Sequence, residues 1–167
     1  YIVGAGGVFY SLNSSGVWVN DYSSLGAPSA IDLNRIFYDR ASNTIMIVGD
    51  NGSTFINTGS SWSYYQIPTA ASCDLTSCFI TGPYKFVVGN SGRMWKFSPN
   101  PTPVWNELLT STSITWPLAV YSASNNLFDV YFRDQLTGYV CGENGTILKT
   151  TDGGVTWAKP NDIYSTT

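Results

Sequence analysis

The sequence predicts an all-β fold of four propeller-type blades, each of about four antiparallel strands, with the first blade incomplete at the N-terminus. One block, which reads Gly-x-x-Gly, strand, turn, Trp, occurs four times in the 167 residues. The first glycines of successive blocks are 45, 40 and 53 residues apart, and a period of ~40–50 residues is typical of propellers. No segment shows the sustained 3.6-residue periodicity of a capped helix.

The paired glycines of the block predict a tight hairpin turn. They are Gly4 and Gly7, Gly49 and Gly52, Gly89 and Gly92, and Gly142 and Gly145. An apolar run such as residues 44–48 precedes them, which indicates a buried strand. The residues between them are mostly small or polar, and Gly and Asn adopt positive φ at little cost. The run that follows, such as residues 146–149, alternates and is expected to pair back.

A tryptophan ends each block, after a second turn: Trp18, Trp62, Trp105 and Trp157. We expect it to open another strand and to pack between neighbouring sheets. One more strand precedes each of the last three blocks, at residues 34–38, 78–81 and 127–132, which completes the four strands of a blade. The first block lacks this strand, because the chain begins inside the pattern at Tyr1, which favours a processed or excised protein.

The expected organisation is a single domain over residues 1–167, with units at about 1–25, 31–68, 75–109 and 126–160 and a tail at 161–167. The last unit contains Thr150-Thr-Asp152-Gly-Gly154-Val-Thr-Trp157. This segment resembles the Asp-box of the Asp-box (BNR) repeat β-propellers and is similar to photosystem II assembly-factor-like and sialidase-like blades. The resemblance implies structural roles, in which Asp152 holds the backbone of the turn and Trp157 fills the space between blades. The other three units lack the Asp.

Composition limits the classes of partner. Charged residues make up 11%, the net charge is −3, and the basic residues are dispersed. A nucleic-acid footprint and a polybasic membrane patch are therefore not supported, and no apolar run reaches the ~18–20 residues of a membrane span. A surface rich in Ser, Thr and Asn favours a secreted protein, outside the cell or at its surface.

The three cysteines allow two interpretations each. Cys73 and Cys78 are close enough in sequence to close a small disulfide loop, which a secreted protein would favour. Metal binding is the alternative, but the chain has no His and no second Cys pair. For Cys141 a buried strand thiol is preferred over an intermolecular bridge.

Catalytic sets are poorly represented, so we expect no enzyme, no cofactor and no metal. Without His, a Ser-His-Asp set is excluded. A sialidase needs three converging arginines and a Tyr–Glu pair, yet one of the two Glu, Glu143, lies in a tight turn. Paired carboxylates for glycoside hydrolysis would come mostly from turns. The four arginines are Arg35, Arg40, Arg93 and Arg133.

Several surface features point to binding. Asn13, Asn51 and Asn144 begin glycosylation sequons, although Asn-Gly is also good turn chemistry. Exposed Tyr and Trp suit protein or carbohydrate contact. Outside the repeated position, Trp95 is expected in the core, whereas Trp116 lies in a Ser/Thr-rich insert at residues 110–124, typical of a loop.

Three functions follow from these observations. The leading hypothesis is a non-catalytic extracellular structural or adhesive module that self-assembles, the tail at 161–167 completing the first blade of a neighbouring copy by strand exchange. The alternative is a closed propeller that binds a protein or glycan partner, as an assembly factor does. A sialidase-like glycosidase is the third.

Overall fold

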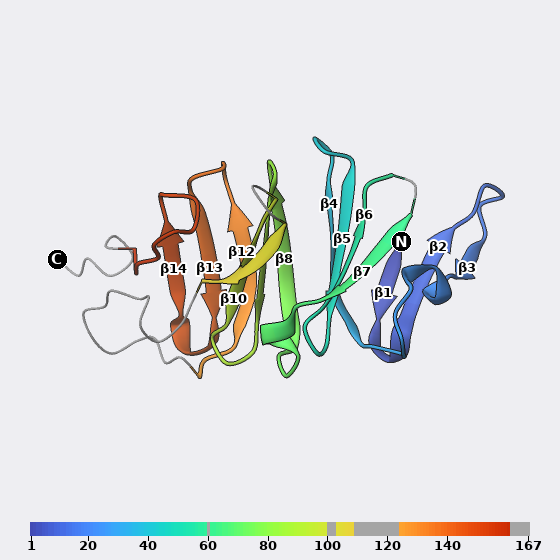
Figure 1. Ribbon diagram of the computed structural model, residues 1–167, viewed down its shortest axis with the longest axis horizontal. Helices are drawn as coiled ribbons and strands as arrows, with labels where there is room; N and C mark the ends of the chain where they lie inside the picture. Colours follow the sequence, from blue (N-terminus) through green and yellow to red (C-terminus); the bar gives the residue numbers. More distant parts are fainter. Residues whose placement is uncertain (60, 100–102, 109–123, 161–167) are drawn as a thin grey trace.

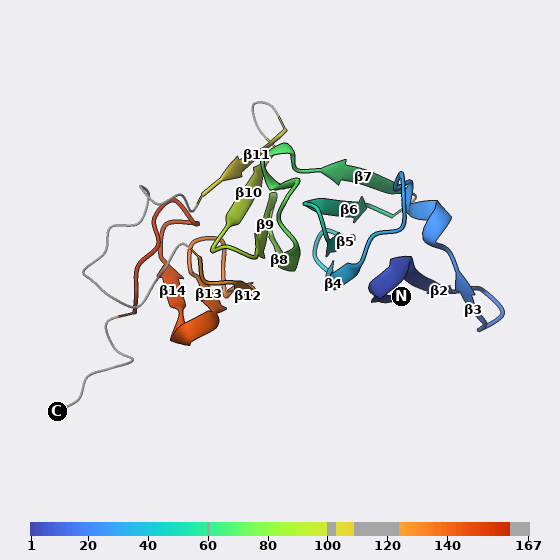
Figure 2. The same cartoon turned by 90° about the horizontal axis from the view of Figure 1, so that it is seen from below.

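The computed structural model describes residues 1–59, 61–99, 103–108 and 124–160. They form four antiparallel sheets that fan out along an arc (Figures 1 and 2). The first sheet contains β1 (Ile2–Gly4), β2 (Val8–Leu12) and β3 (Trp18–Asn20), and the second β4 (Leu33–Asp39), β5 (Thr44–Gly49), β6 (Ser53–Asn57) and β7 (Trp62–Gln66). The third contains β8 (Leu75–Thr81), β9 (Tyr84–Gly89), β10 (Met94–Ser98) and β11 (Val104–Glu107), and the fourth β12 (Leu127–Phe132), β13 (Gly138–Gly142) and β14 (Ile147–Thr150).

The order within each sheet is the order of the chain, with antiparallel neighbours throughout. Short 3-10 turns occupy Ala5–Gly7, Tyr22–Leu25, Pro68–Ala70 and Glu143–Gly145. The all-β, four-blade prediction is therefore confirmed, as is the incomplete first blade, whose sheet begins with the equivalent of β5. In the fourth sheet an isolated bridge between Lys149 and Ala158 stands where the fourth strand is expected. In the described part of the chain, no helix is long and apolar enough to cross a membrane.

The core lies between the sheets rather than inside one of them. Phe9, Ile47 and Phe55 fill the space between the first two sheets, and two further clusters join the second to the third and the third to the fourth. Trp95 is fully buried in the middle cluster, as predicted. Because each large apolar side chain contributes roughly 1.5–3 kcal/mol on burial, the contacts between blades carry much of the stability.

The leading strands β4, β8 and β12 line the inner side of the arc, and β7 and β11 lie on its outer side (Figure 2). Each leading strand carries a register shift at the same position, after Leu33, Leu75 and Leu127. A bulge of this kind bends its strand and re-aims the following side chains. The three leading strands therefore present equivalent residues to the inner surface.

Each end sheet has a neighbour on one side only among the described residues. Exposed apolar side chains follow from this: Trp18 is 47% exposed in the first sheet, and Phe128 and Tyr131 are 53% and 55% exposed in the fourth.

The expected Cys73–Cys78 disulfide is not formed, because both thiols are free and buried. Cys78 lies within β8, which at ~3.3 Å per residue carries it ~10 Å from the start of the strand. Cys73 stays in the preceding turn, where its thiol lies 3.5 Å from the carbonyl oxygen of Asn90, whereas the Cys78 thiol lies 3.8 Å from that of Met46 on β5. Burial raises the pKa of Cys73 to about 11 and that of Cys78 to about 12.

The prediction that Cys141 is buried is also wrong, since its side chain is exposed. Val48 and Val88 hold the same place in the second and third blocks, and both are buried against the next sheet. In the fourth sheet no described segment covers that face.

Candidate functional site

The Gly-x-x-Gly turns have one geometry in all four blades. The third and fourth residues of each turn have positive φ: Gly6 and Gly7, Asn51 and Gly52, Ser91 and Gly92, and Asn144 and Gly145. Two consecutive left-handed residues form the I′-type turn that matches the twist of a hairpin. The predicted positive φ is therefore found at the second glycine of each block.

The first glycine of the block serves a different purpose, because its backbone is extended, with φ of −175° at Gly4 and −165° at Gly142. A Cβ on Gly89 would lie 2.5 Å from the carbonyl oxygen of Asp74, just before the leading strand. A Cβ added to Gly49 or Gly142 would lie as close to the equivalent carbonyl oxygen. At Gly4, whose blade has no leading strand, the nearest atom would be 3.5 Å away.

Neighbouring blades are joined by a repeated hydrogen bond that the sequence analysis missed. The acceptor is the side chain just before the leucine of each leading strand, and the donor is the N–H of the third turn residue of the preceding blade. The pairs are Gly6 N with Asp32 Oδ1 at 2.6 Å, Asn51 N with Asp74 Oδ1 at 3.3 Å, and Ser91 N with Asn126 Oδ1 at 3.0 Å. The recurring Asx-Leu dipeptide was the signal for it.

The repeated tryptophans are buried to different degrees. Trp62 packs edge-on against Phe9 of the preceding sheet, with ring centroids 5.4 Å apart. Trp157 is 4% exposed, within the cluster that joins the third and fourth sheets. Trp105 is partly buried against the cluster between the second and third sheets. Trp18 departs from the expectation of packing between sheets, because the first sheet has no preceding neighbour among the described residues.

Asp152 of the Asp-box holds its own turn together. Its carboxylate accepts hydrogen bonds from the N–H groups of Val155 at 3.0 Å and Thr156 at 2.9 Å, and from the Thr156 hydroxyl at 2.5 Å. The Thr150 hydroxyl donates to it at 2.7 Å and accepts from the N–H of Gly154 at 2.9 Å. These bonds lie within one loop, and short polar side chains stabilise turns in this way.

The three sequon asparagines are engaged in turns. Asn51 and Asn144 occupy left-handed positions, and Asn144 Nδ2 donates to Asn125 at 3.0 Å. Asn13 Oδ1 accepts from the N–H groups of Ser15 and Val17. Turn chemistry accounts for all three residues, and their glycosylation stays a prediction.

The residues considered for catalysis do not converge. Three of the four arginines pair with carboxylates in separate places: Arg35 with Asp129 at 3.8 Å, Arg93 with Glu107 at 2.8 Å, and Arg133 with Asp134 at 3.0 Å. Glu143 accepts from the N–H and the amide of Asn126, both at 2.9 Å. Within the described ranges, no group of three or more His, Cys, Asp or Glu side chains could hold a metal ion.

The inner surface carries two short ladders built from equivalent positions of the leading strands. The rings of Phe37, Phe79 and Tyr131 contact one another in sequence, the first pair tilted and the second edge-to-face, with ring centroids 4.7 and 5.1 Å apart. Ser77 donates to Asp129 at 2.5 Å, and Asp129 also pairs with Arg35. These charges and polar atoms satisfy one another across blades.

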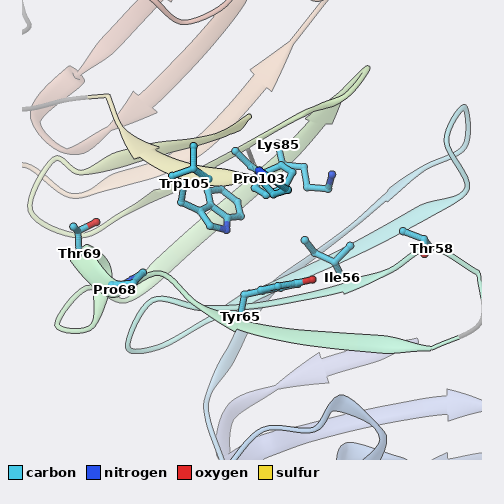
Figure 3. Close-up of a pocket in the computed structure, with 10 residues that line it drawn as sticks. Ile56, Thr58, Tyr65, Pro68, Thr69, Lys85, Pro103 and Trp105 are labelled. Atoms are coloured by element: carbon cyan, nitrogen blue, oxygen red, sulfur yellow. The ribbon is translucent and has the colours of Figure 1, made fainter. Parts of the chain in front are cut away.

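A groove of about 540 Å³ lies between the second and third sheets, on the side of β7 and β11 (Figure 3). Its side chains point toward one another from the two sheets, and most of them are aromatic, aliphatic or proline. The lining residues are Ile56, Thr58, Tyr65, Pro68, Thr69, Lys85, Phe97, Pro103, Val104 and Trp105. Tyr65 is 49% exposed and Val104 is 43% exposed, so the groove is open to a partner.

The third blade fixes one side of this groove. Thr69 Oγ1 accepts from the indole N–H of the buried Trp95 at 2.9 Å, and the Thr69 carbonyl accepts from the Arg93 guanidinium. Arg93 is held in turn by Glu107 and stacks over Trp95 at 4.7 Å.

Among the described residues that line the groove, Lys85 is the one cation. Its Nζ lies 4.8 Å from the centroid of the Phe97 ring, and Phe97 packs against Trp105 with ring centroids 5.4 Å apart. Burial lowers the pKa of the Lys85 ammonium. In the part of the chain that the structure describes, Lys85 forms no ion pair.

Two comparisons with known proteins match part of the chain. The family model for the photosynthesis system II assembly factor YCF48 matches residues 109–165. A photosystem II assembly lipoprotein Ycf48 from Prochlorococcus marinus (strain NATL2A) is 42% identical over 55 residues, which are 32% of this chain and 16% of that protein. The chain thus spans about a sixth of this curated relative.

Solved structures show the same fold. YCF48 from Cyanidioschyzon merolae superposes with a TM-score of 0.61 at 16% identity, over 83% of this chain and 44% of that one. A structure described as YCF48 bound to D1 peptide gives 0.60 at 19% identity, over 78% and 40%. An ancestral GH74 enzyme gives 0.52 at 20% identity, over 78% and 19%.

The comparisons also correct one expectation. An extracellular location is contradicted by the relative, which is described as a photosystem II assembly lipoprotein, and none of the matches supports a filament or a glycoprotein. The resemblance itself is confirmed: residues 109–165 are similar to the photosystem II assembly factor YCF48, and the fold of the chain is that of propeller-type blades.

Proposed function

We propose that this chain is a non-catalytic propeller module that binds a polypeptide partner, in the manner of an assembly factor. The observation that carries the proposal is the open apolar groove between the second and third sheets, walled by aromatic side chains and edged by β7 and β11. Apolar pockets with a few polar groups are the usual form of binding sites. Edge strands such as these pair readily with an added extended segment.

Two further findings support a protein partner over a substrate. One structural neighbour is described as bound to a D1 peptide, and the matched relative is named for assembly. Three of the four arginines and both glutamates that a glycosidase would use are engaged in ion pairs or turns at separate places. Strand exchange through residues 161–167 lies outside the described residues, and the proposal does not depend on it.

The test is a titration with fluorescein-labelled synthetic peptides that tile the D1 polypeptide, followed by fluorescence anisotropy. The proposal expects saturable binding of at least one peptide by the native chain and none by the thermally unfolded chain. Chromogenic sialosides and glucosides are incubated with the same preparation. Turnover of a glycoside without binding of any peptide would contradict the proposal.

A further inference from the structure

We propose that the groove between the second and third sheets recognises an extended peptide segment in which an aromatic residue and an aspartate or glutamate stand two positions apart. This inference rests on the proposed function and specifies the chemistry of the partner.

Lys85 gives the groove its positive charge. Its ammonium lies over the Phe97 ring in an apolar groove, and no described carboxylate pairs with it. A half-buried charge without a partner is costly, because burial disfavours the charged form. The other half-buried cation beside this core, Arg93, is paired with Glu107. A carboxylate supplied by the partner would form an ion pair with the Lys85 ammonium, as Glu107 does with Arg93.

The aromatic walls select the second group. Trp105 on β11 and Tyr65 on β7 face the groove from opposite sheets (Figure 3). Pro68 and Pro103 add rigid apolar surface that loses little entropy on binding. A planar aromatic side chain that enters between Trp105 and Tyr65 buries large apolar area on both faces, and aromatic pairs add about 0.5–1.5 kcal/mol beyond that area.

The spacing of the two groups comes from Phe97, which connects them. Its ring centroid is 4.8 Å from Lys85 Nζ and 5.4 Å from the Trp105 ring centroid. Lys85, Phe97 and Trp105 are register partners on β9, β10 and β11, so the anion position and the aromatic position are neighbours across these strands. In an extended peptide, residues i and i+2 project to the same side at a separation of about 7 Å, which fits one residue beside Trp105 and the next but one beside Lys85.

The polar content of the groove favours a peptide over a glycan. Apart from Lys85, the polar groups of its described lining residues are the Thr58 and Thr69 hydroxyls, the Tyr65 hydroxyl and the Trp105 indole N–H, and Thr69 Oγ1 already accepts from Trp95. A sugar needs several hydrogen bonds to its hydroxyl groups. The mainly apolar walls suit the aromatic side chain of a peptide instead.

The experiment uses the full chain and the probe acetyl-Gly-Phe-Val-Asp-Gly-amide, labelled with fluorescein and followed by anisotropy. The expected result is saturable binding that weakens about tenfold in Lys85→Gln and about tenfold when Asn replaces Asp in the peptide. The two changes together should cost no more than one of them, because both remove the same ion pair. Tyr65→Ala should also weaken binding about tenfold.

Matched control variants exist elsewhere in the chain. Lys149, whose Nζ lies 5.9 Å from the centroid of the Tyr139 ring in the fourth sheet, is the control for Lys85, and Tyr38, 52% exposed on β4, is the control for Tyr65. Lys149→Gln and Tyr38→Ala should leave the affinity unchanged. Near-ultraviolet circular dichroism of every variant checks that the fold is retained.

Three results would overturn the inference: unchanged affinity in Lys85→Gln, tighter binding of acetyl-Gly-Phe-Val with a free C-terminal carboxylate, or binding of cellohexaose in place of the peptide. The failure of the inference is distinct from that of the proposed function. D1 peptides that bind equally well to Lys85→Gln would leave the function standing and place its site elsewhere.

Discussion

The first glycine of each block offers a test of how the blades are built. In Gly89→Ala the new Cβ would lie 2.5 Å from the Asp74 carbonyl oxygen and 2.7 Å from the Cys73 thiol. The carbonyl cannot move freely, because it accepts the N–H of Asn90 at 3.1 Å. Overpacking costs typically 1–3 kcal/mol, the strained hydrogen bond adds about 1 kcal/mol, and the loss of unfolded-state entropy returns roughly 0.4–1 kcal/mol.

The variant should therefore lose about 2–3 kcal/mol of unfolding free energy, estimated from the overpacking scale. At about 2–4 °C per kcal/mol for a chain of this size, the melting temperature should fall by about 5–10 °C. Gly4→Ala is the control, because its Cβ would meet nothing closer than Val8 at 3.5 Å. Thermal and urea unfolding, followed by tryptophan fluorescence, measure both. Equal losses in the two variants would refute the reasoning that the leading strand imposes the glycine.

Three further predictions concern burial and charge. Trp157→Ala should cost about 3–5 kcal/mol, as buried aromatic truncations do, while Trp18→Ala, at an exposed position, should cost less than ~1 kcal/mol; urea unfolding of both variants measures the difference. With Ellman's reagent at pH 8, the native chain should release one thiol equivalent, from the exposed Cys141, and three after unfolding; a mass lower by two hydrogens would instead reveal a disulfide. Hydrogen bonds from the backbone N–H groups of Thr137 and then Leu136 lower the pKa of Asp134 from 3.8 to about 2. The contribution of the Asp134 carboxylate to stability is therefore present above about pH 4 and is lost as the pH falls toward 2. The difference in urea midpoint between the wild type and Asp134→Asn should shrink over that window, and a difference independent of pH would contradict the assignment.

Much of the fold could be predicted from local chemistry. Asn51-Gly52 and Asn144-Gly145 are residue pairs that favour left-handed turns wherever they occur, so the hairpins could be read directly from the sequence. The strand before the second turn, Thr44–Gly49, is apolar on both faces, which indicates burial between two sheets. Both signals are local, and neither depends on where the blades sit relative to one another.

The contacts between blades were harder to predict, because they join residues far apart in the sequence. Cys141 aligns with the buried Val48, yet it is exposed, since burial at this position requires a following sheet. The groove likewise combines Tyr65 with Lys85 and Trp105, which share no motif. Lys85 carried no signal in the sequence. Its significance appears only when Phe97 and the opposite sheet surround it.

Nuclear magnetic resonance on the isotopically labelled chain can map the surface that binds the peptide. Titration with the Phe-Val-Asp probe should perturb the Trp105 indole signal and the backbone amides of Tyr65 and Lys85. The amides of the inner strand β12 should stay unchanged. Perturbations confined to β4, β8 and β12, or none at saturating peptide, would contradict the proposal that the groove between the second and third sheets is the binding site.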